Sequence, residues 1–221
     1  MIKKNKIFVA CDSTNILKIK KIIKETQNTK LKIGYKFGLE FLNSKNGRGF
    51  ISKLKKKIIF ADLKLHDIPN TCVSTIKAIK DLKINYLTIH ISSGLSALKA
   101  VKKNSGKTKI VGVTILTSLD NKALKEIGFK KELEKLVIHQ VKLAKKANLD
   151  AIVCSAMEVP MVRKIFKKEI ITPGVQIGKR NYDQKRSMEA KNVKSDWLVI
   201  GRAITKGNIK KNIQNLSKEL K

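Results

Sequence analysis

Eight short apolar segments alternate along the chain with longer segments that have the periodicity of amphipathic helices. The strand-like segments are rich in Ile, Val and Leu and cover residues 7–11, 31–33, 58–62, 86–91, 109–115, 151–154, 170–172 and 197–200. Between them apolar residues recur at helical spacing, for example Leu133, Leu136, Val137 and Val141. Strands that alternate with helices form right-handed parallel units, and eight units in 221 residues predict a single α/β domain over residues 1–221, a (β/α)8 TIM barrel.

A doubly wound open sheet is the competing fold. Such a sheet usually carries a Gly-rich phosphate-binding turn after its first strand. Here residues 12–15 read Asp-Ser-Thr-Asn, with no glycine. The closed barrel is therefore the preferred prediction.

The third strand segment ends in an array of charges. Its sequence from residue 58 to residue 71 is IIFADLKLHDIPNT. Side chains two residues apart on a strand project from the same face, so Asp62 and Lys64 are predicted to stand together, with Asp67 in the turn that follows. Such residues are often merely solvated, but this array is also suited to an anionic substrate.

Polar residues also stand near other strand segments, and the active sites of barrels lie at the C-terminal ends of the strands. Hydrogen-bonding or charged groups at these positions are Asp12, Lys32, His90, Thr117, Ser118, Gly201 and Arg202. His66 and His90 are read as ordinary hydrogen-bonded histidines. The other groups are predicted to converge on one rim of the barrel.

The string DLKLHDIPNT closely resembles the active-site signature of the orotidine 5′-phosphate decarboxylase family. The resemblance extends over the chain in the family's order, through FVACD, LKIG, VTILTS, ITPG and VIGRAIT. It implies cofactor-independent decarboxylation of orotidine 5′-phosphate to uridine 5′-phosphate (UMP), with no metal. It further implies catalytic roles for Lys64, Asp62, Lys32 and Asp67, where Asp67 is donated across a homodimer interface.

The resemblance also implies the substrate-binding residues. Asp12 and Lys32 would bind the ribose, Thr117 would lie near the pyrimidine, and Gly201 and Arg202 would bind the phosphate. Thr71 of the IPNT segment and Pro173 of ITPG are further expected contacts.

One departure concerns the loop after ITPG, in which no Gln stands at the place usual for a phosphate contact. The candidates to replace it are Gln176, Lys179 and Arg180, and Arg180 is taken as the binding residue.

The formal net charge of +32 raises the question of nucleic-acid binding. The positive residues are nearly all Lys, spread along the chain, without the Arg clusters and aromatic platforms of specific nucleic-acid readers. We therefore expect no specific nucleic-acid partner. The absence of a long apolar segment or signal peptide predicts no membrane association and a cytoplasmic location.

Three widely separated cysteines give no reason to expect a disulfide or a metal site. Two rival functions stay open. One is a metal-dependent phosphosugar decarboxylase or aldolase of the same barrel superfamily, and the other is a basic nucleic-acid-associated protein.

Overall fold

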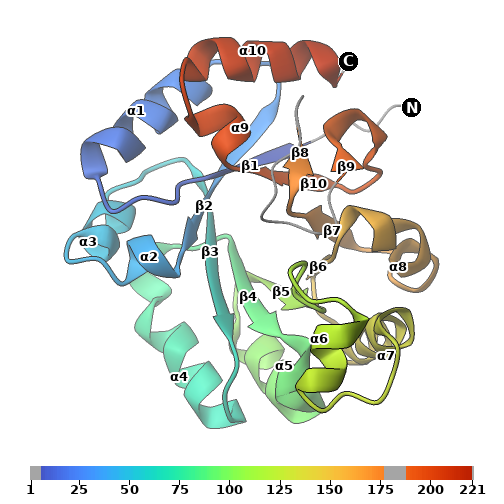
Figure 1. The fold of residues 1–221 in the computed structure, drawn as a ribbon. Helices are drawn as coiled ribbons and strands as arrows, with labels where there is room; N and C mark the ends of the chain where they lie inside the picture. Colours follow the sequence, from blue (N-terminus) through green and yellow to red (C-terminus); the bar gives the residue numbers. More distant parts are fainter. Residues whose placement is uncertain (1–5, 177–187, 221) are drawn as a thin grey trace.

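The structure is a computed structural model that describes residues 6–176 and 188–220. Its centre is a closed barrel of eight parallel strands in the order β1-β10-β7-β6-β5-β4-β3-β2 (Figure 1). These strands are β1 (Lys6–Ala10), β2 (Lys32–Gly38), β3 (Ile58–Leu65), β4 (Tyr86–His90), β5 (Lys109–Val113), β6 (Ala151–Val153), β7 (Glu169–Thr172) and β10 (Trp197–Ile200). The predicted (β/α)8 barrel is confirmed.

Helices surround the barrel on its outside (Figure 1). They are α1 (Ile16–Thr26), α2 (Leu39–Leu42), α3 (Gly47–Ser52), α4 (Pro69–Ala78), α5 (Gly94–Asn104), α6 (Asn121–Glu126), α7 (Leu133–Lys146), α8 (Val159–Ile165), α9 (Arg202–Thr205) and α10 (Ile209–Glu219). The described residues also form four 3₁₀ turns: η1 (Lys80–Leu82), η2 (Ile91–Ser93), η3 (Ala156–Glu158) and η4 (Ala190–Asn192).

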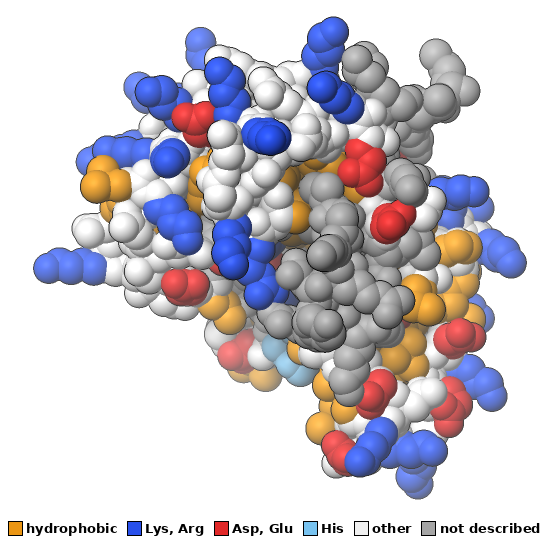
Figure 2. Space-filling view, turned by 45° about the horizontal axis from the view of Figure 1, so that its top comes forward, with side chains coloured by type: hydrophobic (Ala, Val, Ile, Leu, Met, Phe, Trp, Pro, Cys, Tyr) orange, Lys and Arg blue, Asp and Glu red, His pale blue; other side chains and the backbone are white. Residues whose placement is uncertain are grey.

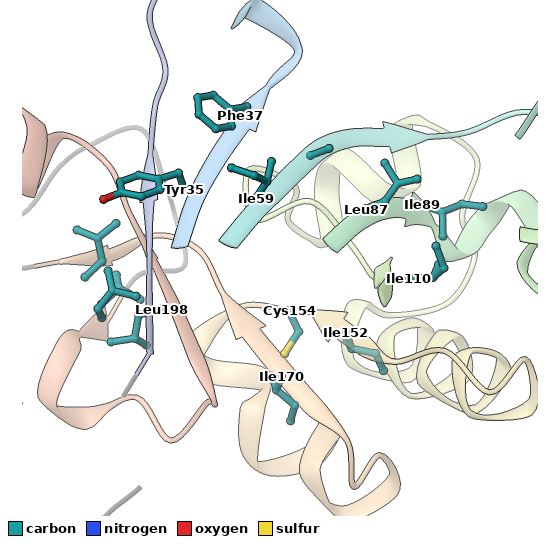
Figure 3. Close-up of a cluster of buried hydrophobic side chains, with 14 of the residues drawn as sticks. Tyr35, Phe37, Ile59, Leu87, Ile89, Ile110, Ile152, Cys154, Ile170 and Leu198 are labelled. Carbon is teal, nitrogen blue, oxygen red and sulfur yellow. The ribbon is translucent and has the colours of Figure 1, made fainter. Parts of the chain in front are cut away.

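Side-chain alternation on the strands divides the core into two layers. One face of each strand packs against the helices, and this layer includes Tyr35, Phe37, Ile59, Leu87, Ile110 and Leu198 (Figure 3). The other face fills the barrel interior, with Phe8, Phe60, Tyr86, Val111, Ile171 and Trp197. Phe8 stacks on Trp197 with ring centroids 4.0 Å apart. The interior is therefore packed with side chains, which leaves the C-terminal ends of the strands as the place for a site.

A network around Glu169 lies among the N-terminal ends of the strands. Its carboxylate accepts hydrogen bonds from Lys6, Tyr86, Lys109 and Trp197, at 2.8–3.2 Å. Burial and then the Glu169 charge raise the pKa of Tyr86 to about 12, so its hydroxyl stays a donor at neutral pH. This network ties β1, β4, β5, β7 and β10 together at the end of the barrel opposite the predicted site.

The strand boundaries differ from the prediction most clearly at the second strand. Residues 31–33 were expected to form it, whereas β2 runs over Lys32–Gly38. A small parallel pair, β8 (Val175–Gln176) with β9 (Met188–Glu189), was not predicted.

The surface seen in Figure 2 has Lys and Arg side chains spread over several parts of this face, with fewer acidic side chains between them. In the part of the chain that the structure covers, no helix combines the length and apolar character needed to cross a bilayer.

Candidate active site

A cavity of about 340 Å³ opens at the C-terminal ends of the barrel strands. One side is lined by charged side chains, those of Asp12, Lys36, Asp62 and Lys64. Much of the remaining wall is apolar and comes from β5 and the segment after it, β6, β8 and β10, including Val113, Ile115, Leu116, Val153, Val175 and Val199. A polar edge beside an apolar wall suits a ligand with one charged and one less polar part.

The charged side chains form a chain of alternating sign. Lys36 Nζ lies 3.1 Å from Asp12 Oδ1 and 3.5 Å from Asp62 Oδ2. Lys64 Nζ lies 2.8 Å from the same Asp62 Oδ2. The four groups come from β3, β2 and the end of β1, so the barrel itself holds them in place.

The structure corrects the prediction that Lys32 belongs to this network. Lys32 is the first residue of β2, pairs in register with Lys6 at the start of β1, and is exposed. Lys36 lies four residues later on the same strand face, about 13 Å further along β2 at the rise of an extended chain. Contrary to the prediction, Lys32 therefore does not lie beside these carboxylates, and Lys36 lies where Lys32 was expected.

Burial and the neighbouring charges shift the pKa of Asp62 in opposite directions. Burial alone would raise the pKa of the Asp62 carboxyl, but the ammonium groups of Lys36 and Lys64 outweigh it and hold that pKa below its ordinary value. For Lys36, burial lowers the pKa, and the carboxylates of Asp62 and Asp12 more than reverse this. Both groups are therefore charged at neutral pH.

Lys64 has an unusual backbone conformation. Its φ is +49°, in the left-handed region that non-glycine residues seldom adopt. The pairing of β3 with β4 loses its regular register between Ala61 and Leu65, which brackets Lys64. Residues held in this way are concentrated at functional sites, where the surrounding structure fixes them.

Most of the predicted binding residues line the cavity. Asp12, Thr117, Pro173, Gly201 and Arg202 are all part of its wall. Their roles toward a substrate stay predictions, since the geometry gives their place and not their ligand.

Two other predicted residues lie outside this wall. Thr71 is exposed in the first turn of α4, and Asp67 is exposed, with Oδ1 accepting a hydrogen bond from the Ile68 N–H at 2.7 Å. Arg180 lies outside the described residues, as does Lys179.

The comparison with protein families decides the relationship. Residues 5–213 match the model of the orotidine 5′-phosphate decarboxylase / HUMPS family. The chain belongs to this family.

Curated members of the decarboxylase family are similar over most of the chain. An orotidine 5′-phosphate decarboxylase of Wolbachia sp. subsp. Brugia malayi is 46% identical over 182 residues, which cover 78% of this chain and 80% of the relative. One from Bacillus mycoides is 39% identical over 188 residues, 77% of this chain and 79% of the relative.

Solved structures of the family have the same fold. The orotidine 5′-phosphate decarboxylase of Lactobacillus acidophilus superposes with a TM-score of 0.82 at 28% identity, over 98% of this chain and 99% of its own. The Methanocaldococcus jannaschii enzyme, solved with the inhibitor BMP, gives 0.79 at 22% identity, over 98% of this chain and 99% of its own, a likeness of fold.

Sequence reasoning about this decarboxylase family member missed two residues of the site. A signal for Lys36 was present, because Lys36-Phe37-Gly38 repeats the Lys-x-Gly pattern of Lys32-Ile33-Gly34 four residues later. The other is Thr88 on β4, whose hydroxyl donates to Asp62 Oδ1 at 3.1 Å. Nothing in its local sequence sets Thr88 apart from an ordinary strand threonine.

Proposed function

We propose that the protein decarboxylates orotidine 5′-phosphate to UMP without a cofactor, the last step of de novo pyrimidine nucleotide synthesis. The observation that carries this proposal is the chain of alternating charges Asp12–Lys36–Asp62–Lys64 at the mouth of the barrel. Membership of the family and the names of the curated relatives support it.

Lys64 is proposed to act at the reacting carbon. Loss of CO2 from the orotate ring leaves an electron pair on the sp² carbon C6, and the ring offers little delocalisation for that pair. An ammonium group placed beside C6 stabilises the developing negative charge and then transfers a proton to the carbon. The 2.8 Å contact with Asp62 and the fixed backbone of Lys64 keep this ammonium group in position before the substrate binds.

Asp62 is proposed to face the carboxylate of the substrate. Two like charges about 4 Å apart repel by about 4 kcal/mol at an effective dielectric constant of 20, and the repulsion ends when CO2 departs. The ammonium groups of Lys36 and Lys64 offset part of it, because both lie within 3.5 Å of Asp62 Oδ2. Lys36 also contacts both Asp62 and Asp12. We propose that Asp12 binds the ribose hydroxyls of the substrate.

Other residues of the cavity wall are proposed to bind the phosphate and the base. Gly201 and Arg202 would hold the phosphate, with Pro173 beside it, and Thr117 would contact the pyrimidine. Their shared position on the cavity wall supports this assignment. Thr71 and Arg180 stay predictions from the family resemblance.

We propose a homodimer in which Asp67 completes the charge network of the neighbouring subunit. Asp67 is exposed and absent from the cavity wall of its own chain, and the next residue, Ile68, is an apolar side chain that is 66% exposed. In the proposed dimer, contact with the partner subunit would remove part of the Ile68 side chain from water. A cytoplasmic location and a single domain over residues 1–221 are part of the same proposal.

A direct assay tests the function. We expect the purified protein to consume orotidine 5′-phosphate at the same rate with and without EDTA. The loss of absorbance of orotidine 5′-phosphate measures this rate. Loss of the activity in EDTA would favour a metal-dependent phosphosugar enzyme of the same superfamily. Salt-sensitive binding of duplex DNA without turnover would instead favour a nucleic-acid-associated protein.

A further inference from the structure

Thr88 lies on β4, fully buried, next to the charged side of the cavity. Its hydroxyl makes two contacts with β3. The Lys64 backbone N–H donates to Thr88 Oγ1 at 2.7 Å, and Thr88 Oγ1 donates to Asp62 Oδ1 at 3.1 Å. One side chain therefore contacts both the backbone of Lys64 and the carboxylate of Asp62.

The chemistry of the groups fixes the direction of both hydrogen bonds. A backbone N–H can only donate, so the hydroxyl oxygen accepts from Lys64, and its single proton is left for the carboxylate. Asp62 Oδ1 is thereby held by Thr88, while Oδ2 faces the ammonium groups of Lys36 and Lys64 at 3.5 and 2.8 Å. The two oxygens cannot exchange places without breaking these contacts.

The same hydroxyl supports the unusual backbone of Lys64. The β3–β4 ladder is irregular between Ala61 and Leu65, and the Lys64 N–H bonds to a side chain of β4 at this point. Lys64 has a φ of +49°, a conformation that persists only where the surroundings hold it. The hydrogen bond from Lys64 to Thr88 is a specific contact that does so.

We propose that Thr88 is a positioning residue for the decarboxylation, which orients the Asp62 carboxylate and holds the backbone of Lys64 through one hydroxyl group. Thr88 itself need not touch the substrate. The proposal rests on the proposed function for its kinetic consequences, but the link between Thr88 and Asp62 can be measured without turnover.

Charged and titratable groups face Asp62 from its own strand and from the neighbouring strands. Lys36 reaches it from β2 and Lys64 from β3 itself, Asp12 acts through Lys36 from the end of β1, and His90 interacts with it from β4. Loss of the Thr88 hydroxyl would leave these groups in place and remove one hydrogen bond to the charged form of Asp62. The acid limb of the pH profile of kcat should then move to higher pH.

Thr88→Val tests the proposal, because it replaces the hydroxyl by a methyl group of similar size. We expect kcat to fall by about 10- to 100-fold, as for the loss of a hydrogen bond to a charged group, and the Kd of UMP to stay within about threefold. Thr26→Val is the matched control, since Thr26 is equally buried and its hydroxyl contacts the Ile22 carbonyl and the Tyr35 hydroxyl, away from the cavity. An unchanged kcat in Thr88→Val, or an equal loss in Thr26→Val, would overturn the proposal.

Thr88→Ser and Thr88→Ala decide the matter if Thr88→Val does not fold. Both lack the methyl group, and they differ only in the hydroxyl. We expect Ser to keep kcat within about threefold of the native protein and Ala to lose activity as described for Val. Equal losses in the two variants would assign the effect to packing and contradict the proposal.

A titration of the carboxyl carbons by NMR separates this proposal from the proposed function. The Asp62 resonance is assigned with Asp62→Asn, and its pKa is compared between the native protein and the Thr88 variants. A higher pKa of Asp62 without the hydroxyl supports the link even if the native protein fails to consume orotidine 5′-phosphate. An unchanged pKa would refute the link even if the native protein is an active decarboxylase.

Discussion

Two lysines on one strand show how finely a site depends on position. Lys32 and Lys36 lie on the same face of β2 and each begins a Lys-x-Gly triplet, but only Lys36 reaches the carboxylates of Asp12 and Asp62. The glycines of the two triplets, Gly34 and Gly38, also face different surroundings. A Cβ on Gly34 would lie 2.6 Å from the Phe8 ring in the barrel interior, whereas one on Gly38 would lie 3.5 Å from Lys36 Nζ.

The first prediction compares these two lysines. Lys36→Ala should lower kcat/KM for orotidine 5′-phosphate by at least about 100-fold, because it removes a preorganised charge between two carboxylates. Lys32→Ala, at the opposite end of the same strand, should stay within about twofold of the native value. Steady-state kinetics of the two variants measure this directly, and the reverse order of effects would restore the original assignment of Lys32.

The second prediction concerns Arg202 on the cavity wall. Arg202→Ala should raise KM much more than it lowers kcat, with a loss of about 1.5–3 kcal/mol for a charge-assisted contact with phosphate. Arg163→Ala serves as a control, since Arg163 bonds to the Lys168 carbonyl and to Asp196 away from the cavity. An unchanged KM in Arg202→Ala would place the phosphate elsewhere.

Residue types alone could locate part of the site. Asp62, Lys64, Asp12 and Arg202 were found because they follow apolar strand segments, where a barrel places its reactive groups. Lys36 was missed because two triplets in the same phase of one strand offer the same local pattern, and only the pairing of β2 with β1 and β3 distinguishes them.

At the level of elements, apolar strand segments were easier to locate than their ends. The eight predicted segments all correspond to barrel strands. The second was predicted too short, because Gly34, Lys36 and Gly38 interrupt the apolar pattern in the part of β2 that follows residue 33. Long-range pairing determines such a boundary, and local composition does not.

The contact between Asp62 and Lys64 was predicted, but strand alternation explains only part of it. Simple alternation along a regular strand places residues two apart on one face. In the structure Lys64 has a left-handed φ within β3, and the ladder with β4 is irregular there. The contact between the two side chains is real at 2.8 Å, but it depends on β4 and Thr88 as well as on β3.

The third prediction concerns the N-terminal ends of the strands, where Glu169 accepts hydrogen bonds from four side chains. Burial would raise the pKa of Glu169, but hydrogen bonds from Lys109 and Tyr86 outweigh it and hold that pKa below its ordinary value. Glu169→Gln should lower the free energy of unfolding by roughly 1–3 kcal/mol at neutral pH, because the charged acceptor is lost.

The pH dependence of that loss gives a further check. Since the folded-state pKa of Glu169 is lowered, its contribution to stability is present above the pKa of the unfolded chain and is lost as the pH falls through the folded-state value. Denaturant unfolding should therefore show the difference between Glu169→Gln and the native protein shrinking in acid. Glu126→Gln, at an exposed position of α6, should show little difference at either pH.

At the level of the whole molecule, charge and assembly act on the same site. The net charge of +32 favours the approach of any anionic ligand, and the effect weakens with salt. The described cavity and its charge network are formed by residues of one chain. Asp67, like Lys32, does not line the cavity of its own chain, and in the proposed homodimer each site would take Asp67 from the second chain.

The last prediction tests that assembly by mixing two inactive variants, Lys64→Ala and Asp67→Ala. If each site takes Lys64 from one subunit and Asp67 from the other, a mixed dimer has one site with both lesions and one site with neither. Random exchange makes about half of the dimers mixed, and each has one intact site of two, so activity should approach about a quarter of the native value, as twofold symmetry requires. Subunit exchange is verified with differently tagged chains, and each variant incubated alone is the control. If mixed dimers form and no activity returns, Asp67 acts within its own subunit and the shared site is wrong.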